Sequence, residues 1–142
     1  MIEFIDFIAD HLIEFKYDGL ETDIPAYIPE EYNTNFVHSK QVKTIIADDK
    51  VIGFVGLMQI NKDTFQLWGF LNKAIRDCKL SLYKTLKREL RTLNYPRLQV
   101  LVGSHLEPAQ RLIEHLGFVQ EGLLRKFTDN KDYYIYSIIG GA

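Results

Sequence analysis

The first fifteen residues place apolar side chains at helical spacing. Ile5, Ile8 and Leu12 recur three or four positions apart, and acidic residues occupy positions between them. This spacing predicts an amphipathic helix over residues 2–15. Residues 18–35 are interrupted by one glycine and two prolines, so we expect a loop there, with at most a short helical turn.

Three segments rich in apolar, β-branched and aromatic residues follow, at 42–47, 51–60 and 64–71. Short polar turns separate them, at Asp48-Asp49-Lys50 and at Asn61-Lys62-Asp63. Runs of strand length joined by turns rich in Asp and Asn are typical of antiparallel hairpins. The sequence therefore predicts three antiparallel strands in this region.

Helical and strand patterns alternate in the second half of the chain. A helix is predicted from Leu80 to Leu93, with an apolar stripe on one side and a basic face on the other. The run over 98–102 is typical of a strand that is covered on both faces. The remaining predicted elements are a helix over 107–116, a strand that starts at Phe118 with a bulge at Gly122, a turn at 129–132 and a strand over 133–139.

This order of elements predicts an α/β (α+β) fold. The strand–helix–strand segment from 64 to 102 requires a parallel crossover within a mixed, mostly antiparallel sheet of six or seven strands. Helices are expected on both faces of that sheet. We expect one domain over residues 1–142, with a helical and loop region at 1–35 and a core at 36–139.

Composition excludes several classes of protein. The chain has 142 residues, of which 46% are hydrophobic and 25% charged, so it is neither disordered nor of low complexity. It contains one cysteine, Cys78, which excludes an internal disulfide. No apolar run is long enough to cross a membrane, and no basic lead-in marks a secretory leader. We therefore expect a cytoplasmic protein without a membrane partner.

The net charge of −2 conceals two segments of opposite sign. Residues 1–35 carry nine acidic side chains and one basic side chain, whereas residues 73–97 carry eight basic and two acidic ones. A basic block in a nearly neutral chain indicates either a local anion site or a solvated helix face. The four histidines show no metal-ligand spacing, so no metal site is predicted.

The start of the basic block has the features of an anion site. Residues 72–81 join a predicted strand to a helix N-terminus, where backbone N–H groups and the helix dipole favour phosphate. Arg76 and Lys79 add positive charge at the same point. Cys78 lies among these cations, which favours a lowered pKa of its thiol. The alternative interpretation is an ordinary connection between a strand and a helix.

The segment 109–125, AQRLIEHLGFVQEGLLR, resembles the C-terminal signature of the GNAT superfamily of N-acetyltransferases. In this family a helix ends in Leu-Gly-Phe, and the next strand carries Glu-Gly and a basic residue. Element order extends the resemblance over residues 36–139. The resemblance implies a sheet that splays between the strands at 64–71 and 98–102. It also implies acetyl-CoA as the acyl donor and an amine, free or on a protein, as the acceptor.

The resemblance further implies where acetyl-CoA binds. The pyrophosphate loop of the family corresponds to residues 76–81, in which Lys79 replaces the first glycine and Ser81 keeps a small side chain. Backbone amides of the preceding strand are implied to polarise the thioester carbonyl. The residues implied to bind acetyl-CoA are Phe70, Leu71, Arg76, Asp77, Cys78, Lys79, Leu80 and Ser81.

Three positions that carry chemistry in many family members differ in this chain. Leu106 and Ile113 stand where those members have an asparagine and a proton-donating tyrosine. The strand over 64–71 contains no carboxylate that could act as a general base. The remaining candidates for a catalytic side chain, two after the strand at 98–102 and one on the last strand, are Ser104, His105 and Tyr134.

Two functions are consistent with these residues. The first is an N-acyltransferase in which an amine attacks the thioester of acyl-CoA directly. The second is a catalytically degenerate GNAT-fold protein with a structural or binding role. The ending YIYSIIGGA and residues 73–76 are similar to the small internal virion core proteins of T7-like phages, which implies a virion-associated protein with other virion proteins as partners. Nucleic acid as a partner is disfavoured by the net negative charge.

Overall fold

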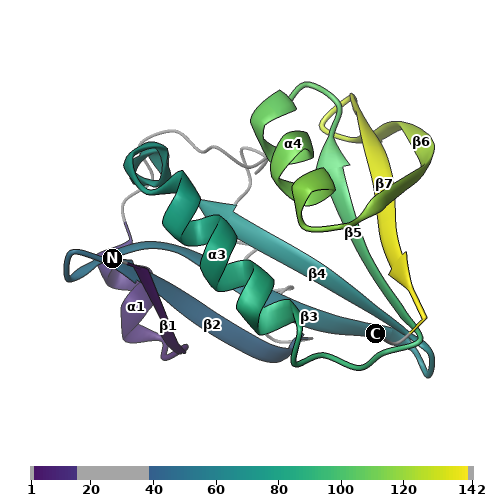
Figure 1. The fold of residues 1–142 in the computed structure, drawn as a ribbon. Helices are drawn as coiled ribbons and strands as arrows, with labels where there is room; N and C mark the ends of the chain where they lie inside the picture. Colours follow the sequence, from purple (N-terminus) through teal and green to yellow (C-terminus); the bar gives the residue numbers. More distant parts are fainter. Residues whose placement is uncertain (1, 16–38, 141–142) are drawn as a thin grey trace.

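A sheet of seven strands, in the order β1-β2-β3-β4-β5-β7-β6, forms the centre of the computed structural model (Figure 1). The structure describes residues 2–15 and 39–140, so the loop predicted at 18–35 lies outside the described residues. The predicted mixed sheet of six or seven strands is confirmed. The elements are β1 (Ile2–Asp6), α1 (Asp10–Glu14), β2 (Ser39–Ala47), β3 (Lys50–Asn61), β4 (Thr64–Leu71), the 3₁₀ helix η1 (Lys73–Asp77), α3 (Lys79–Leu90), β5 (Arg97–Gly103), α4 (Glu107–His115), β6 (Val119–Thr128) and β7 (Lys131–Ile139).

The predicted helix over residues 2–15 is wrong. β1 pairs antiparallel with β2, and only the five-residue helix α1 follows it. Ile2 and Phe4 pack into the core, whereas Ile5 and Ile8 of the predicted apolar stripe are 36% and 54% exposed. Ile2 and Phe4, two residues apart, therefore point to the same face of a strand. A strand forms here because the edge of β2 offers backbone hydrogen-bond partners and an apolar surface for these side chains.

The predicted hairpins are confirmed. β2, β3 and β4 pair antiparallel in sequence order, and so do β6 and β7. Asp48 and Asp49 make the first turn, Asp129 and Asn130 make the last, and all four have φ between 51° and 62°. Positive φ at both central residues matches the twist of the flanking strands, and Asp and Asn tolerate this conformation better than most residues.

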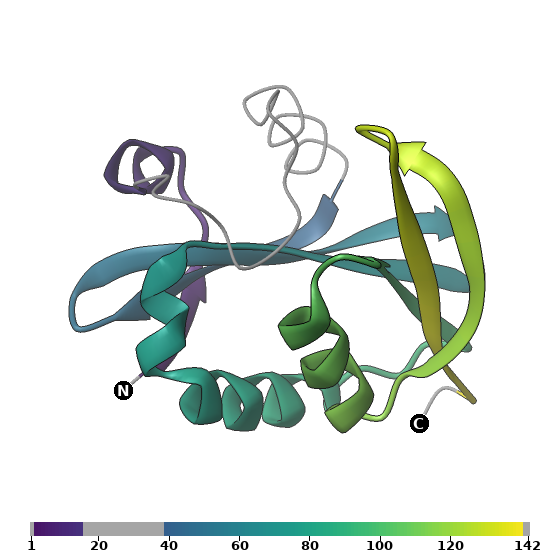
Figure 2. The same cartoon turned by 90° about the horizontal axis from the view of Figure 1, so that it is seen from above.

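Helices cover both faces of the sheet, as predicted. α3 and α4 lie on one face, called here the helix face, and α1 lies on the opposite face, called the α1 face (Figure 2). Leu82 and Leu86 of α3 and Ile113 of α4 are buried in the larger core cluster. A smaller cluster beneath α1 contains Phe54 and Trp68. The sheet therefore has two separate apolar layers.

α3 ends at Leu90, three residues before the predicted end at Leu93. The Thr92 hydroxyl donates a hydrogen bond to the Glu89 carbonyl at 2.7 Å, and the N–H of Leu93 donates to the carbonyl of Leu90. These bonds satisfy the last carbonyls of the helix and tighten the backbone into a turn. The basic side chains on the outer side of α3 and just past its end, Lys84, Lys87, Arg88 and Arg91, are exposed.

β4 and β5 pair in parallel through only four residues each. Thr64–Leu67 pairs with Arg97–Val100, and the pairing ends there although both strands continue. β5 instead remains paired with β7 as far as Gly103. The two strands therefore diverge toward their C-terminal ends (Figure 1), which confirms the predicted parallel crossover and the predicted splay.

The expectation that the strand at 98–102 is covered alike on both faces is wrong. Leu98, Val100 and Val102 are buried on the helix face. Gln99 lies between them and points to the α1 face, where it hydrogen-bonds to other polar side chains. On the α1 face the strand presents the polar Gln99 and the half-buried Leu101, so only its helix face is fully buried.

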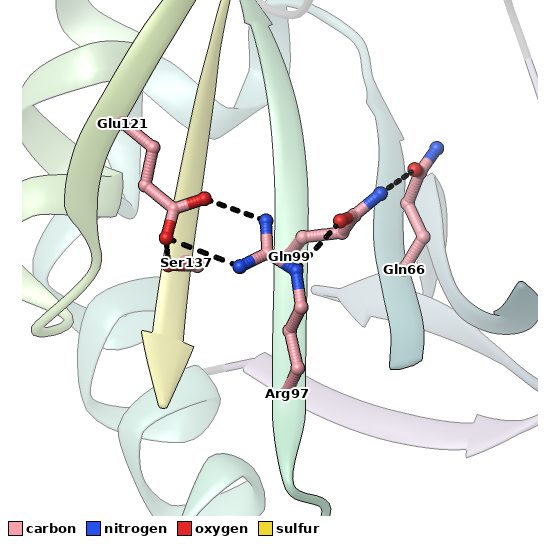
Figure 3. A network of polar contacts seen from close by, with 5 residues as sticks. All are labelled: Gln66, Arg97, Gln99, Glu121 and Ser137. Carbon is pink, nitrogen blue, oxygen red and sulfur yellow. Dashed lines mark hydrogen bonds and ion pairs between the residues drawn. The ribbon is translucent and has the colours of Figure 1, made fainter. Parts of the chain in front are cut away.

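A chain of polar side chains crosses the sheet on the α1 face (Figure 3). The Glu121 carboxylate accepts two hydrogen bonds from the Arg97 guanidinium, at 3.1 and 2.6 Å, and one from the Ser137 hydroxyl, at 2.7 Å. Arg97 Nε donates to Gln99 at 3.0 Å, and Gln99 donates to Gln66 at 2.8 Å. The hydrogen bonds from Arg97 and then Ser137 lower the pKa of Glu121 to about 2.

The pairing of β6 with β7 is irregular at two places. The register shifts between Gln120 and Gly122, which confirms the predicted bulge, and shifts again between Leu124 and Thr128. The first shift leaves Glu121 as the extra residue of the bulge, and its carboxylate reaches Arg97. The bulge therefore positions the acidic end of the polar chain.

Replacing Gly56 by alanine is expected to destabilise the sheet. A Cβ at Gly56 would lie 2.3 Å from Cζ2 of Trp68, the residue opposite it on β4. We expect the free energy of unfolding, measured with urea, to fall by about 1–3 kcal/mol. Gly69→Ala is the control, since its Cβ would lie 3.5 Å from the nearest atoms. Equal stability of Gly56→Ala and the parent would contradict the packing of Trp68.

Replacing Glu121 by glutamine tests the acidic end of the polar chain. The folded pKa of Glu121 is about 2, below the usual unfolded value of about 4.3, so its carboxylate stabilises the fold above that unfolded value. This stabilisation disappears as the pH falls toward 2. The difference in unfolding free energy between parent and Glu121→Gln is therefore expected to be largest at pH 6 and to shrink toward pH 2. A difference that is independent of pH would contradict the ion pair, and Glu89→Gln on α3 is the control.

Candidate functional site

The divergence of β4 and β5 opens a cavity of about 470 Å³, called here the splay cavity. Residues 66–71 of β4 and 100–103 of β5 form its two sides, and α4 contributes Ala109 and Leu112. Leu86 of α3 and Ile113 line it from the helix face, whereas Tyr133 and Phe127 belong to the other side. The cavity therefore extends through the sheet rather than lying on one surface.

Backbone groups of β4 point into the gap. The N–H of Asn72 donates to the Ile52 carbonyl at 2.9 Å, so alternation along the strand directs the N–H of Phe70 to β3 as well. The same alternation directs the N–H of Gly69 toward β5, whose pairing with β4 has ended at Val100. The site thus offers a main-chain donor from Gly69 rather than from Phe70.

The side chains of the two predicted β4 residues lie on opposite faces. Phe70 is 5% exposed and packs with Trp68 in the α1-face cluster, and Leu71 is 6% exposed in the helix-face cluster. Both residues line the splay cavity. Their contact with a bound acyl group stays a prediction.

The predicted phosphate loop forms η1 and the first turn of α3. The Asn72 side chain accepts the N–H of Ala74 at 3.0 Å and caps η1. Arg76 and Lys79 are exposed, and Lys79 is the first residue of α3. The first N–H groups of a helix have no acceptor within that helix, so this end of α3 favours an anion.

A second cavity of about 500 Å³ lies between the N-terminal half of α3 and α4. Lys79, Leu80 and Tyr83 line it from α3, and Arg111 and His115 line it from α4. Sequence reasoning missed Arg111, because only the packing of the two helices brings it beside the predicted phosphate loop. The groove is apolar between cationic side chains, which suits a ligand with a flat apolar part and negative charges.

Cys78 and Ser81 are engaged by the protein itself. The Cys78 thiol donates to the Ala74 carbonyl at 3.6 Å, and burial, with the nearby Asp77 carboxylate acting in the same direction, raises its pKa. The prediction of a lowered thiol pKa is therefore wrong, because desolvation outweighs the surrounding positive charge. The Ser81 hydroxyl accepts the backbone N–H of Ile2 at 3.3 Å, which ties β1 to the first turn of α3.

The predicted catalytic candidates lie outside the lining of the splay cavity as far as the described residues define it. The Ser104 backbone bonds to Asp132 and to the Gln110 side chain, and His105 is exposed. Tyr134 packs against the helix-face core cluster. A catalytic role for these three side chains stays a prediction.

Tyr133 and Tyr136 of β7 lie on opposite faces of the sheet and in different surroundings. Tyr133 is 5% exposed and lines the splay cavity, beside the ring of Phe127. Tyr136 lies in the opposite layer and donates to Glu114 at 2.9 Å, and burial followed by this hydrogen bond raises its pKa to about 12. Sequence reasoning placed the candidate at Tyr134, whereas strand alternation brings Tyr133 to the gap.

Neither a metal site nor a membrane-spanning helix is found within residues 2–15 and 39–140. This part of the chain has no group of three His, Cys, Asp or Glu side chains arranged to hold a metal ion. None of its helices is long and apolar enough to cross a membrane. The candidate site therefore consists of the two cavities and the loop between them.

Comparison with known proteins gives the fold. No protein-family model matches the sequence, and no curated protein matches it. Among solved structures, a GNAT-family acetyltransferase from Bacillus anthracis superposes with a TM-score of 0.68 and 17% identity over 97% of this chain and 94% of its own. An N-acetyltransferase from Staphylococcus aureus Mu50 superposes with a TM-score of 0.67 and 14% identity over 98% and 97% of the two chains.

A third structure, of a protein assigned as an acetyltransferase, has a TM-score of 0.71 and 22% identity over 97% of this chain and 82% of its own. These identities are low, while the superpositions span nearly the whole of this chain. The chain thus shares its overall fold with acetyltransferases of known structure. The chain has the GNAT fold that its sequence resemblance predicts.

Proposed function

We propose that this chain is an N-acetyltransferase that moves an acetyl group from acetyl-CoA to an amine. The observation that carries this proposal is the splay cavity, which extends through the sheet between β4 and β5. Such a cavity lets a donor and an acceptor approach each other from opposite faces. A reaction between two bound substrates depends mainly on this kind of positioning.

The helix face is the proposed side of acetyl-CoA. The exposed Arg76 and Lys79 stand at the N-terminus of α3, and Arg111 lines the groove between α3 and α4. Guanidinium and ammonium groups at a helix N-terminus recognise phosphate by charge and by hydrogen bonds. The groove then leads toward the splay cavity, because Leu71, Ala109 and Leu112 line both.

Bound acetyl-CoA supplies an activated acyl group, whose C–S bond breaks as the acceptor amine forms a C–N bond. The N–H of Gly69, which points toward the gap, is the proposed donor to the carbonyl oxygen of that group, where negative charge develops. The apolar walls exclude water and favour the uncharged, nucleophilic form of the amine. The phenol of Tyr133 is the proposed group that gives a proton to the departing thiolate, and its phenolate then takes the proton that the nitrogen of the new amide loses.

A non-catalytic binding role is the alternative. Leu106 and Ile113 line the splay cavity at the positions where the family resemblance implies an asparagine and a tyrosine. These two side chains cannot move a proton, so they favour a domain that holds a ligand without reacting it. Binding of acetyl-CoA without turnover of any amine would support this alternative.

Replacing Arg76 by alanine tests the acetyl-CoA site. A charged hydrogen bond to phosphate contributes about 1.5–3 kcal/mol, so the affinity for acetyl-CoA, measured by calorimetry, is expected to fall about tenfold or more. Arg88→Ala, on the outer side of α3, is the matched control and is expected to bind like the parent. Absence of binding by the parent at millimolar acetyl-CoA would overturn the proposed function, and unchanged affinity of Arg76→Ala would remove this residue from the site.

Replacing Tyr133 by phenylalanine tests proton transfer. We expect kcat for amine acetylation to fall about a hundredfold with little change in KM, because only the hydroxyl is lost. Tyr134→Phe makes the same chemical change on the opposite side of β7 and is expected to change kcat by less than about twofold. Equal losses in the two variants would assign the effect to the strand rather than to the Tyr133 hydroxyl.

A further inference from the structure

Gln66 stands where the paired part of β4 ends and the splay cavity begins. It pairs with Gln99 across the parallel ladder, is half-buried, and lines the cavity. Strand alternation puts its side chain on the α1 face, together with those of Trp68 and Phe70. Gln66 is therefore the last member of the polar chain that begins at Glu121 (Figure 3).

Arg97 fixes the direction of the two hydrogen bonds that lead from it through Gln99 to Gln66. A guanidinium only donates, so the atom of Gln99 that Arg97 Nε contacts at 3.0 Å is the carbonyl oxygen. The amide nitrogen of Gln99 then faces Gln66 and donates to its carbonyl oxygen at 2.8 Å. The NH₂ group of Gln66 consequently lies on the side away from Gln99, at the outer end of the polar chain (Figure 3).

The polar chain thus ends in a hydrogen-bond donor, the NH₂ group of Gln66, at the splay cavity. Among the residues that the structure describes, none accepts a hydrogen bond from the Gln66 nitrogen. The described residues that line the cavity also include no Asp, Glu, Lys or Arg. A ligand that reaches Gln66 from the α1 face therefore meets a directed donor and no carboxylate.

We propose that Gln66 is a specificity-determining residue that donates a hydrogen bond to a carboxylate oxygen of the acceptor, so that the acceptor class is amino acids rather than simple amines or polyamines. The inference rests on the proposed function for the identity of the reaction. It follows from the face on which Gln66 lies, because acetyl-CoA is assigned to the helix face and the acceptor to the α1 face. A carboxylate suits an NH₂ donor, whereas an extra ammonium group would meet that donor without an acceptor.

Two substitutions each replace the NH₂ donor at the cavity by an oxygen that accepts hydrogen bonds, and they do so by different routes. Gln66→Glu still accepts from Gln99 but presents an oxygen to the cavity in place of the NH₂ group. Gln99→Glu still accepts from Arg97, yet it has no N–H to donate, so Gln66 turns its amide and presents its own carbonyl oxygen. Gln99 is a positioning residue, because it acts on the acceptor only through Gln66.

The test compares amines that differ only by a carboxylate, with acetyl-CoA at saturation: glycine with methylamine, phenylalanine with 2-phenylethylamine, and lysine with 1,5-diaminopentane. The ratio of kcat/KM within each pair is measured, and this ratio does not depend on how much of a variant is folded. The parent is expected to prefer the carboxylate-bearing member about tenfold or more, and both Gln→Glu variants are expected to lose that preference. Gln59→Glu, an exposed residue of β3, is the matched control and is expected to keep it.

Unchanged ratios in Gln66→Glu and Gln99→Glu would overturn the proposal, and so would a change in Gln66→Glu alone, since an added charge at residue 66 would then explain it. A parent that prefers the amine without a carboxylate would overturn it as well.

A binding measurement separates this inference from the proposed function. The side-chain amide signals of Gln66, identified in NMR spectra by their loss in Gln66→Glu, are followed during titration with N-acetylphenylalanine and with N-acetyl-2-phenylethylamine. Movement with the carboxylate-bearing compound alone supports the proposal even where no amine is turned over. No movement with either compound overturns it, whatever the calorimetry shows for acetyl-CoA.

Discussion

The early end of the β4–β5 ladder is the constraint on which the rest of the site depends. Backbone N–H and C=O groups seek hydrogen-bond partners, and two parallel strands that separate leave such groups open. Each of the two strands stays paired on its other side, β4 with β3 and β5 with β7, so the gap cannot close by sliding. The opening is therefore a property of the sheet topology, which gives the site a rigid frame.

The polar chain on the α1 face combines two different physical effects. The Arg97–Glu121 pair is partly exposed, with 26% and 37% of the side chains accessible, so its contribution to stability is modest and screened by salt. Its directional effect does not weaken in the same way, because a guanidinium cannot accept a hydrogen bond at any salt concentration. Arg97 of β5, held in a weak ion pair with β6, thereby fixes which atom Gln66 presents on the adjacent strand β4.

Sequence reasoning succeeded where structure is decided locally and failed where it is decided by distant pairing. The Asp48-Asp49 turn, the bulge at Gly122 and the helix that ends before Gly117 follow from the preferences of neighbouring residues. β1 depends on an open strand edge some forty residues away, so periodicity within 2–15 misled. In the candidate site, the phosphate loop is a prediction made from its charge and its place before a helix, whereas the position of Tyr133 required knowledge of which face of β7 meets the gap. The Gln66 chain joins residues on four strands, and no local pattern reports it.

β6 forms one outer edge of the sheet, and an exposed edge is ordinarily a template on which another chain can add a strand. The edge is also hydrophobic, since Val119, Leu123 and Phe127 on this strand are 66%, 49% and 51% exposed. The two register shifts and the left-handed conformation of Lys126, with φ of 48°, interrupt the outer row of N–H and C=O groups. An incoming strand finds only short regular stretches, so this edge resists the cross-strand stacking that begins fibril growth.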